Sequence, residues 1–210
     1  MTTFQIALDT FSLDQAIEMA AMLADQVQVF EIGTPLVLRE GTNAIRRMRE
    51  RFPKHDILAD YKMMDAGDYE AHIAYEAGAS IVTVCGAANP ETVQNAVKQA
   101  RKDKAKVMID MIAVRGLEEW LEAYDEFGAD YIQVHTAFDG RGDKSPLEDL
   151  KLAKKILKKS KCAVAGGIGL HDIKEIAAAG PDHIILGSRL FAAEDIKEEM
   201  RKIAAEVNGV

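Results

Sequence analysis

The chain contains little cysteine and little proline, and it has no long apolar run. Only two of its 210 residues are Cys and only five are Pro. This composition excludes a scaffold that depends on several disulfides, and Cys85 and Cys162, which lie beside apolar residues, are expected to be reduced and buried. Since no run of about eighteen apolar residues occurs, no membrane-spanning helix is expected. Residues 1–4 do not begin a secretory signal, so we expect a cytoplasmic protein.

An excess of basic residues is also absent. The 26 Lys and Arg residues are outnumbered by 34 Asp and Glu residues, which gives a formal net charge of −8. A chain with this charge is not expected to bind nucleic acid or an anionic membrane, so an anionic substrate needs a local site. Five lysines between residues 151 and 159 fall at the spacing of one helix face, and a solvent-exposed face is the expected interpretation.

What is present is a regular alternation of two kinds of segment. Short apolar runs, typical of strands buried on both faces of a parallel sheet, alternate with longer segments of helical periodicity. The short runs predict eight strands, at residues 4–8, 29–32, 57–59, 81–84, 107–109, 131–134, 163–165 and 183–186. The longer segments predict amphipathic helices, among them residues 14–24, 43–51, 69–77, 91–101, 117–127, 147–158 and 193–207.

Eight strand–helix units predict an α/β fold, a (β/α)8 TIM barrel that occupies residues 1–210 as a single domain. No linker or change of composition divides the chain. A doubly wound open sheet shows the same alternation, so it stays open as the alternative.

Ionisable and glycine residues follow the predicted strands at the end where a barrel enzyme collects its reacting groups. Two neighbouring strands lead to Glu31 and Asp60, which would repel each other unless a cation or a proton lay between them. Because oxygen ligands suit Mg²⁺ and no His/Cys cluster suggests zinc, we predict that these carboxylates hold Mg²⁺. The alternative is that Glu31 only caps the turn at residues 33–35. The residues at the carboxyl ends of the eight predicted strands are Asp9, Glu31, Asp60 with Lys62, Cys85, Asp110, His135, Gly166 with Gly167, and Gly187 with Ser188.

The segment from Asp60 to Asp65 carries the densest group of charges. In an extended strand Asp60 and Lys62 point to the same side, where the pair can orient a substrate hydroxyl or help to hold a metal. Asp65 lies in the following loop, before the next helix. A surface ion pair with Asp65 as a helix cap is the alternative.

His135 follows a strand, and its ordinary pKa suits proton transfer at the mouth of the barrel. A histidine beside apolar residues can also be structural, but the ionisable groups at the other strand ends favour a catalytic role. The remaining histidines, His55, His72, His171 and His183, precede or begin strands or lie on helices and receive no role.

Two glycine loops follow the last two strands. Gly166 and Gly167 in one loop, and Gly187 with Ser188 in the other, place backbone N–H groups before a helix, where a phosphate can bind. The loops after strands seven and eight are the usual phosphate site of such barrels. Simple turn formation is the alternative.

Motifs distributed over the chain resemble one family. The chain resembles the 3-hexulose-6-phosphate synthases, within the orotidine-5′-phosphate decarboxylase superfamily, essentially from end to end. The motifs that carry the resemblance are residues 7–9 (ALD), 31–35 (EIGTP), 59–67 (ADYKMMDAG), 134–136 (VHT) and 165–168 (AGGI).

This resemblance implies a Mg²⁺-dependent aldol condensation of formaldehyde with D-ribulose 5-phosphate to D-arabino-hex-3-ulose 6-phosphate, and the reverse cleavage. It implies that Glu31 and Asp60 bind the metal, that Asp9 and Lys62 contact the sugar hydroxyls, and that Asp65 reaches the site of the second subunit of a homodimer. The glycine loops would bind the phosphate. Many relatives have arginine directly after the glycine of the second loop, whereas here Ser188 comes first and Arg189 follows.

The implied chemistry is removal of a proton from C1 of the ketose phosphate, which leaves an enediolate whose charge the metal and Lys62 stabilise. We assign His135 as the acid and base, although Asp110 or a metal-bound water could do the same work.

Three alternatives to the synthase are weighed. The sister 3-keto-L-gulonate-6-phosphate decarboxylases carry glutamate at the position of Asp110 and arginine at that of Phe138, and here the nearby Arg141 lies at a different spacing. Ribulose-phosphate epimerases carry several metal-binding histidines at strand ends, which this chain lacks. A non-catalytic sugar-phosphate-binding protein would have no need to retain Lys62 and His135 together.

Overall fold

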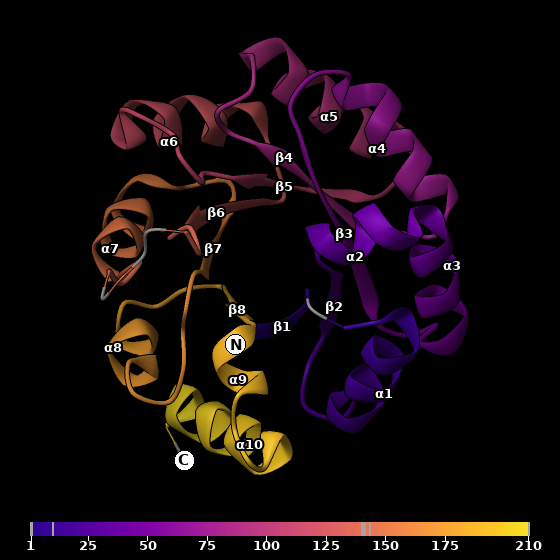
Figure 1. The fold of residues 1–210 in the computed structure, drawn as a ribbon. Coiled ribbons are helices and arrows are strands. Elements are labelled where there is room, and N and C mark those ends of the chain that lie inside the picture. The colour runs from indigo at the N-terminus through magenta and orange to yellow at the C-terminus, as the bar shows by residue number, and fades with distance from the viewer. Residues whose placement is uncertain (1, 10, 140–141, 143, 210) are drawn as a thin grey trace.

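The computed structural model describes residues 2–9, 11–139, 142 and 144–209. Its centre is a closed barrel of eight parallel strands that follow one another in chain order, with the first strand hydrogen-bonded to the last (Figure 1). This closure confirms the (β/α)8 barrel and excludes the open doubly wound sheet. The strands are β1 (Thr3–Leu8), β2 (Val29–Ile32), β3 (Asp56–Met63), β4 (Ile81–Cys85), β5 (Lys106–Asp110), β6 (Tyr131–His135), β7 (Lys161–Ala165) and β8 (His183–Leu186).

The helices surround the barrel (Figure 1). They are α1 (Leu13–Leu23), α2 (Thr34–Glu40), α3 (Thr42–Arg51), α4 (Gly67–Glu76), α5 (Pro90–Lys102), α6 (Leu117–Phe127), α7 (Leu147–Ile156), α8 (Ile173–Ala178), α9 (Ser188–Phe191) and α10 (Ile196–Asn208). Two short helices, α2 and α9, were not predicted, whereas α8 is the helix of the predicted strand–helix unit that begins with residues 163–165. Pro35 in the first turn of α2 explains its start, because proline fits the beginning of a helix.

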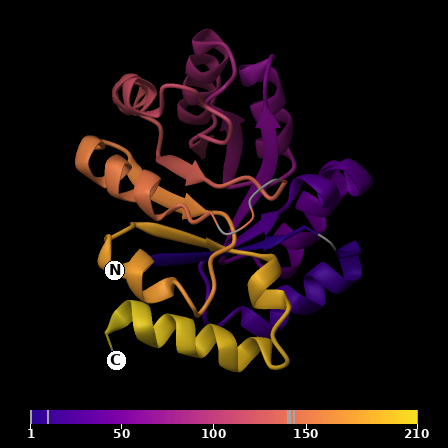
Figure 2. The same ribbon diagram turned by 60° about the vertical axis from the view of Figure 1, so that its left-hand side comes forward.

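Two apolar layers hold the barrel together. The larger packs the outward faces of the strands against the helices, and the smaller fills the barrel interior with side chains that include Leu58, Met108 and Ile185. The interior is therefore a packed core, and substrate chemistry is confined to its open ends. In the turned view α10 runs along the outside of the barrel (Figure 2), and it packs against α1 and α8. Among the described helices, none combines the length and apolarity needed to cross a membrane.

Strand β3 differs most from the sequence prediction. It continues beyond Ala59 to Met63, and its register against β4 shifts between these two residues. Lys62 has a φ of 45°, in the left-handed region that a lysine rarely adopts. Asp60 and Lys62 therefore lie in the strand end, where an extended segment was expected, but the backbone at Lys62 is left-handed and not extended.

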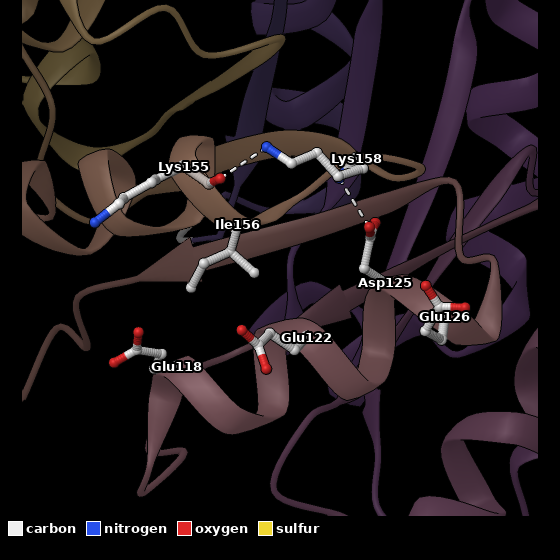
Figure 3. Close-up of a pocket in the computed structure, with 7 residues that line it drawn as sticks. All are labelled: Glu118, Glu122, Asp125, Glu126, Lys155, Ile156 and Lys158. Carbon is white, nitrogen blue, oxygen red and sulfur yellow. Dashed lines mark hydrogen bonds between the residues drawn. The ribbon is translucent and has the colours of Figure 1, made fainter.

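Asp125 joins the end of α6 to the segment that enters β7. Its carboxylate accepts hydrogen bonds from the backbone N–H groups of Lys158 (2.8 Å), Lys159 (3.1 Å) and Ser160 (2.7 Å). It lies in a groove of about 370 Å³ between α6 and α7, on the outside of the barrel and lined mainly by acidic and lysine side chains (Figure 3). Burial opposes ionisation, but these N–H donors hold the pKa of Asp125 below its ordinary value.

Replacing Asp125 with Asn is expected to lower the free energy of unfolding by roughly 2 kcal/mol, since charged hydrogen bonds are lost and a backbone N–H then faces an amide NH₂. A lowered pKa means that the wild-type advantage is present above the ordinary value of 3.8 and is lost as the pH falls through the lower folded value. Denaturant unfolding of both proteins at several pH values measures this. The exposed Glu126, paired with Lys159 at 2.5 Å, is the control: Glu126→Ala should cost less than about 0.5 kcal/mol. Equal losses of unfolding free energy in the two variants would contradict the stabilising role of the Asp125 carboxylate.

Candidate active site

Lys62 is the positive centre of the barrel mouth. Its Nζ donates to Oδ2 of Asp60 and lies 3.7 Å from Oδ2 of Asp110. Burial alone would lower the pKa of Lys62, but the charges of Asp60, Asp110 and Glu31 raise it above its ordinary value. The ammonium is therefore charged throughout the neutral range. The structure brings together three residues that the sequence analysis singled out.

Two threonines fix the Asp60 carboxylate in place. Thr34 Oγ1 donates to Oδ2 over 2.7 Å, and Thr83 Oγ1 donates to Oδ1 over 2.7 Å. Thr83 Oγ1 also accepts the backbone N–H of Lys62 at 2.9 Å, so one hydroxyl holds both the carboxylate and the irregular backbone. Burial disfavours the charge, but Lys62 and the hydroxyl donors lower the pKa of Asp60. Asp60 is thus a fixed anion.

Glu31 is buried on β2 beneath the mouth. Gln5 Nε2 donates to its Oε2 over 2.6 Å. Burial, followed by the nearby charges of Asp60 and Asp9, raises the pKa of Glu31 well above its ordinary value. The repulsion between Glu31 and Asp60 that the sequence predicts is therefore present.

Asp9, at the end of β1, completes the acidic group. Its pKa is raised by burial and by Asp60, while Lys62 and His135 oppose the shift. A methyl group at Gly33 would lie 1.9 Å from Oδ1 of Asp9, which explains why glycine occupies position 33. The glycine of the EIGTP motif thus makes space for an acid of the site.

The donor set suits a hard divalent cation. Lys62 forms an ion pair with Asp60, lies near Asp110, and interacts electrostatically with Asp9 and Glu31. The mouth therefore has one ammonium group and four carboxyl groups, so acidic groups are in excess. Within the described ranges, no group of three or more His, Cys, Asp or Glu side chains is arranged to hold a metal ion. A cation at Glu31 and Asp60 would therefore have two protein carboxylates and complete its shell with water and substrate oxygens. Mg²⁺ commonly binds in this way, so the residues fit it.

His135 and Asp110 form a second unit, which Lys62 approaches through the Asp110 carboxylate. His135 Nδ1 lies 3.0 and 3.1 Å from the two Asp110 oxygens, and the backbone N–H of Ile112 donates to Oδ1 of Asp110 over 3.0 Å. Because a carboxylate only accepts, we assign the imidazole proton to Nδ1 and the free lone pair to Nε2. The His135 side chain is 19% exposed, whereas Asp110 is fully buried. This arrangement orients a histidine for proton transfer at Nε2.

The two glycine loops lie at the ends of β7 and β8. Gly166 has a φ of 114°, and a methyl group there would lie 2.5 Å from the carbonyl oxygen of Thr136. A side chain is therefore excluded by both conformation and space. Gly187 precedes the short helix α9, which begins at Ser188. Arg189 is exposed, and its Nη1 contacts the His171 ring in a cavity of about 540 Å³ beside Gly169.

Comparisons with known proteins decide the family. The model of the orotidine 5′-phosphate decarboxylase / HUMPS family matches residues 2–203. A 3-hexulose-6-phosphate synthase of Staphylococcus aureus (strain bovine RF122 / ET3-1) is 40% identical over 206 residues, which are 98% of this chain and 98% of the relative. The chain belongs to the orotidine 5′-phosphate decarboxylase / HUMPS family.

Solved structures of this family agree closely with the fold. A 3-hexulose-6-phosphate synthase from Salmonella typhimurium superposes with a TM-score of 0.96 at 37% identity, over 99% of each chain. A 3-keto-L-gulonate-6-phosphate decarboxylase from Vibrio cholerae O1 superposes with a TM-score of 0.86 at 25% identity, over 99% of this chain and 98% of that one. These relatives support an enzyme of the lyase type.

Two residues that the sequence analysis discussed, Asp65 and Phe138, are exposed to solvent. Asp65 is exposed between β3 and α4, and the structure does not bring it to Lys62. Phe138 is 73% exposed, and Arg141 lies outside the described residues.

Cys85 is at the mouth, where its Sγ donates to the carbonyl oxygen of Lys62 over 3.4 Å. Burial is the main cause that raises the pKa of the Cys85 thiol to about 11, so the thiol is neutral.

The sequence analysis missed the polar residues that lie beside the charged side chains of the barrel mouth. Gln5, Thr83 and Gln133 are buried within strands that were treated as apolar, and Thr34 begins α2. A pattern that could have found them is a polar residue inside an otherwise apolar buried strand, because such a group needs a partner. The side-chain amide of Gln133 lies 3.2 Å from His135 Nδ1, and because that nitrogen carries the proton that faces Asp110, the amide borders the ring without donating to it.

Proposed function

We propose that the chain is a 3-hexulose-6-phosphate synthase, which condenses formaldehyde with D-ribulose 5-phosphate to D-arabino-hex-3-ulose 6-phosphate and also catalyses the reverse cleavage. The observation that carries this proposal is the arrangement of a fixed ammonium, Lys62, between a buried acidic group and an oriented histidine, His135. Such a site can remove a proton next to a carbonyl and stabilise the oxygen charge that results. The 40% identity to a curated synthase supports the choice of reaction.

Each end of the sugar phosphate has a matching group. The phosphate would bind to backbone N–H groups of the glycine loops after β7 and β8, at Gly166, Gly167, Gly187 and Ser188. Arg189 stays a candidate phosphate ligand, since its loop position is right but its guanidinium contacts His171. Asp9 and Lys62 would hydrogen-bond the sugar hydroxyls, and these contacts fix the position of C1 at the mouth.

Glu31 and Asp60 would hold Mg²⁺. When bound, this ion would supply positive charge to the oxygens of the ketose beside the reacting carbon. Gln5 keeps one oxygen of Glu31 in a hydrogen bond, and Thr34 and Thr83 do the same for Asp60. The two carboxylates are therefore oriented before substrate binds.

The reaction follows from the groups at the mouth. His135 Nε2 takes a proton from C1 of the ketose, and the electron pair moves to give an enediolate with negative charge on the C2 oxygen. Lys62 donates a hydrogen bond to that oxygen. C1 then attacks the carbon of formaldehyde, the C2 carbonyl forms again, and the formaldehyde oxygen receives the proton from His135. Asp110 keeps the imidazole in the tautomer that these reaction steps need, with the proton on Nδ1 and the lone pair on Nε2.

We propose further that the active unit is a homodimer with shared sites. Asp65 lies on the surface close in sequence to the exposed apolar residues Met64 (53%) and Tyr69 (67%), and Leu38 on α2 is 81% exposed. Exposed apolar side chains of this kind are typical of a surface that another chain covers. A second copy would bury them and bring Asp65 to the partner's mouth.

Two rates measured side by side test the proposed reaction. The purified protein is incubated with ribulose 5-phosphate, formaldehyde and Mg²⁺ while formaldehyde loss is followed, and in parallel with 3-keto-L-gulonate 6-phosphate while carbon dioxide release is followed. The proposal expects the first rate to dominate. A dominant second rate would favour the sister decarboxylase, and the absence of both rates would refute both reactions and leave the non-catalytic sugar-phosphate-binding protein as the alternative.

Replacing Thr83 with Val is expected to lower kcat about 10- to 100-fold, because supporting residues of an active site commonly have effects of this size. The change removes the hydroxyl that holds both Asp60 and the backbone of Lys62 while keeping the shape of the side chain. Thr92→Val, at a buried threonine of α5, is the control and should leave kcat within about twofold. A kcat of wild-type size in the Thr83 variant would contradict the supporting role.

Mixing two inactive variants tests the shared site. Asp65→Ala and Lys62→Met each remove one half of a site that two chains would build. After unfolding and refolding together, random pairing should restore about a quarter of wild-type activity, because half of the dimers then contain one intact site. Formaldehyde consumption measures the restored activity. If Asp65 acted within its own chain, the mixture would remain inactive.

A further inference from the structure

Beneath the active site, the interior of the barrel contains a continuous chain of hydrogen bonds. His183, at the start of β8, is fully buried, and Gln5 on β1 is 1% exposed. His183 Nδ1 lies 2.6 Å from Thr3 Oγ1, and His183 Nε2 lies 2.7 Å from Gln5 Oε1. Gln5 Nε2 then donates to Glu31 Oε2 over 2.6 Å. The chain therefore connects the far end of the barrel to one of the candidate metal ligands.

Each link fixes the direction of the next. A Glu31 carboxylate that holds a cation is ionised and can only accept, so Gln5 presents its NH₂ group to Glu31 and its Oε1 to His183. His183 Nε2 must then carry the proton, which leaves Nδ1 to accept from the hydroxyl of Thr3 at 2.6 Å, a shorter contact than the 3.2 Å from the same hydroxyl to the carbonyl oxygen of Asp182. When Glu31 is ionised, a flipped Gln5 amide would place its oxygen against a carboxylate oxygen of Glu31.

The histidine is suited to such a fixed link. Burial is the main cause that lowers the pKa of His183 to about 3, with a further contribution from Lys161, so the ring is neutral in the neutral pH range. Its ring also packs 5.3 Å from the ring of Tyr131, measured between centroids. The imidazole therefore keeps one position and one tautomer.

We propose that Gln5, held by His183 and Thr3, is a positioning residue that keeps Glu31 oriented as an acceptor and so determines how tightly the barrel mouth binds its divalent cation. The inference rests on the proposed function insofar as Glu31 and Asp60 hold Mg²⁺. Outer hydrogen bonds of this kind typically change metal affinity about 10- to 100-fold. The sequence analysis assigned no role to His183, and this proposal gives it a supporting one.

Calorimetric titration with Mg²⁺ tests the proposal, with the protein held in ribulose 5-phosphate and without formaldehyde. Gln5→Leu should raise the Kd for Mg²⁺ about 10- to 100-fold, and His183→Phe should raise it about tenfold. His183→Gln keeps a donor in reach of Gln5 and should stay within about threefold of wild type. Ile185→Val, at the position paired with Gln5 in β8, changes packing alone and should stay within about twofold.

Each result decides the matter. A folded Gln5→Leu protein with the wild-type Kd for Mg²⁺ would overturn the proposal. If Gln5→Leu does not fold, the comparison of His183→Phe with His183→Gln replaces it, and equal Kd values there would overturn the proposal as well. A wild-type protein that binds no Mg²⁺ would overturn both this inference and the assigned cation site. Mg²⁺ binding that depends on Gln5, without formaldehyde consumption, would support the inference while refuting the synthase.

Discussion

Replacing Lys62 with Met is expected to lower kcat/KM for formaldehyde condensation by about 10³-fold, the upper range for loss of one group that stabilises a developing oxygen charge. The ammonium is fixed by Asp60 and Asp110 before substrate arrives, so it does not need to reorganise during the reaction. Without it, the acidic side chains of the mouth would oppose the negative charge on the C2 oxygen. Most of the loss should appear in kcat, because the contact strengthens as that charge forms.

A second lysine of the barrel provides the control. Lys106 begins β5 and pairs with Asp56 over 2.6 Å, away from the acidic group of the mouth. Lys106→Met should leave kcat within about twofold. Steady-state kinetics of both variants, after melting curves show that each is folded, measure the difference. Similar losses in the two variants would show that Lys62 acts through general electrostatics and not at the reacting oxygen.

Replacing His135 with Gln is expected to lower kcat about 10²- to 10⁴-fold, the usual range for loss of a general acid and base. Glutamine can still accept or donate a hydrogen bond, but it cannot carry the C1 proton. The affinity for ribulose 5-phosphate should change by less than about threefold, since the phosphate and hydroxyl contacts are made by other residues. Kinetics and calorimetric binding of the sugar phosphate measure the two quantities separately.

His72 is the matched control for this change. It lies on α4 and pairs with Asp103 at 2.9 Å, in the same kind of histidine–aspartate contact as His135 and Asp110. His72→Gln should retain wild-type kcat, because this pair lies outside the mouth. An unchanged kcat in His135→Gln would remove His135 from the mechanism and leave Asp110 as the candidate base.

The fold was predictable because its pattern is local. The apolar runs of the eight strands and the helical periodicity between them depend on neighbouring residues. Closure of the barrel was left open, because it depends on pairing between β1 and β8, which lie far apart in the sequence. Short helices such as α9, with four residues, carry too few periodic positions to be recognised. The extension of β3 to Met63 was missed for a different reason. The left-handed backbone at Lys62 is stabilised by Thr83 on the next strand, which a local pattern cannot show.

The charged residues of the site were predictable because parallel strands end together. That rule correctly grouped Glu31, Asp60, Lys62 and the pair of Asp110 and His135. It could not place Asp65, whose proposed position depends on a second chain. It also gave no reason to examine Gln5 and His183, because residues within or before a strand are outside its scope.

The most direct test of the central claim, that this mouth removes a proton from C1 of a bound ketose, is exchange of the C1 protons of ribulose 5-phosphate with deuterated water. The wild-type protein is incubated with Mg²⁺ and the sugar phosphate without formaldehyde, and the C1 protons are followed by NMR. The account predicts enzyme-dependent loss of one C1 proton signal, slowed at least about 10²-fold in His135→Gln and unchanged in His72→Gln. A protein that binds the sugar phosphate and Mg²⁺ but leaves both C1 protons in place would contradict it.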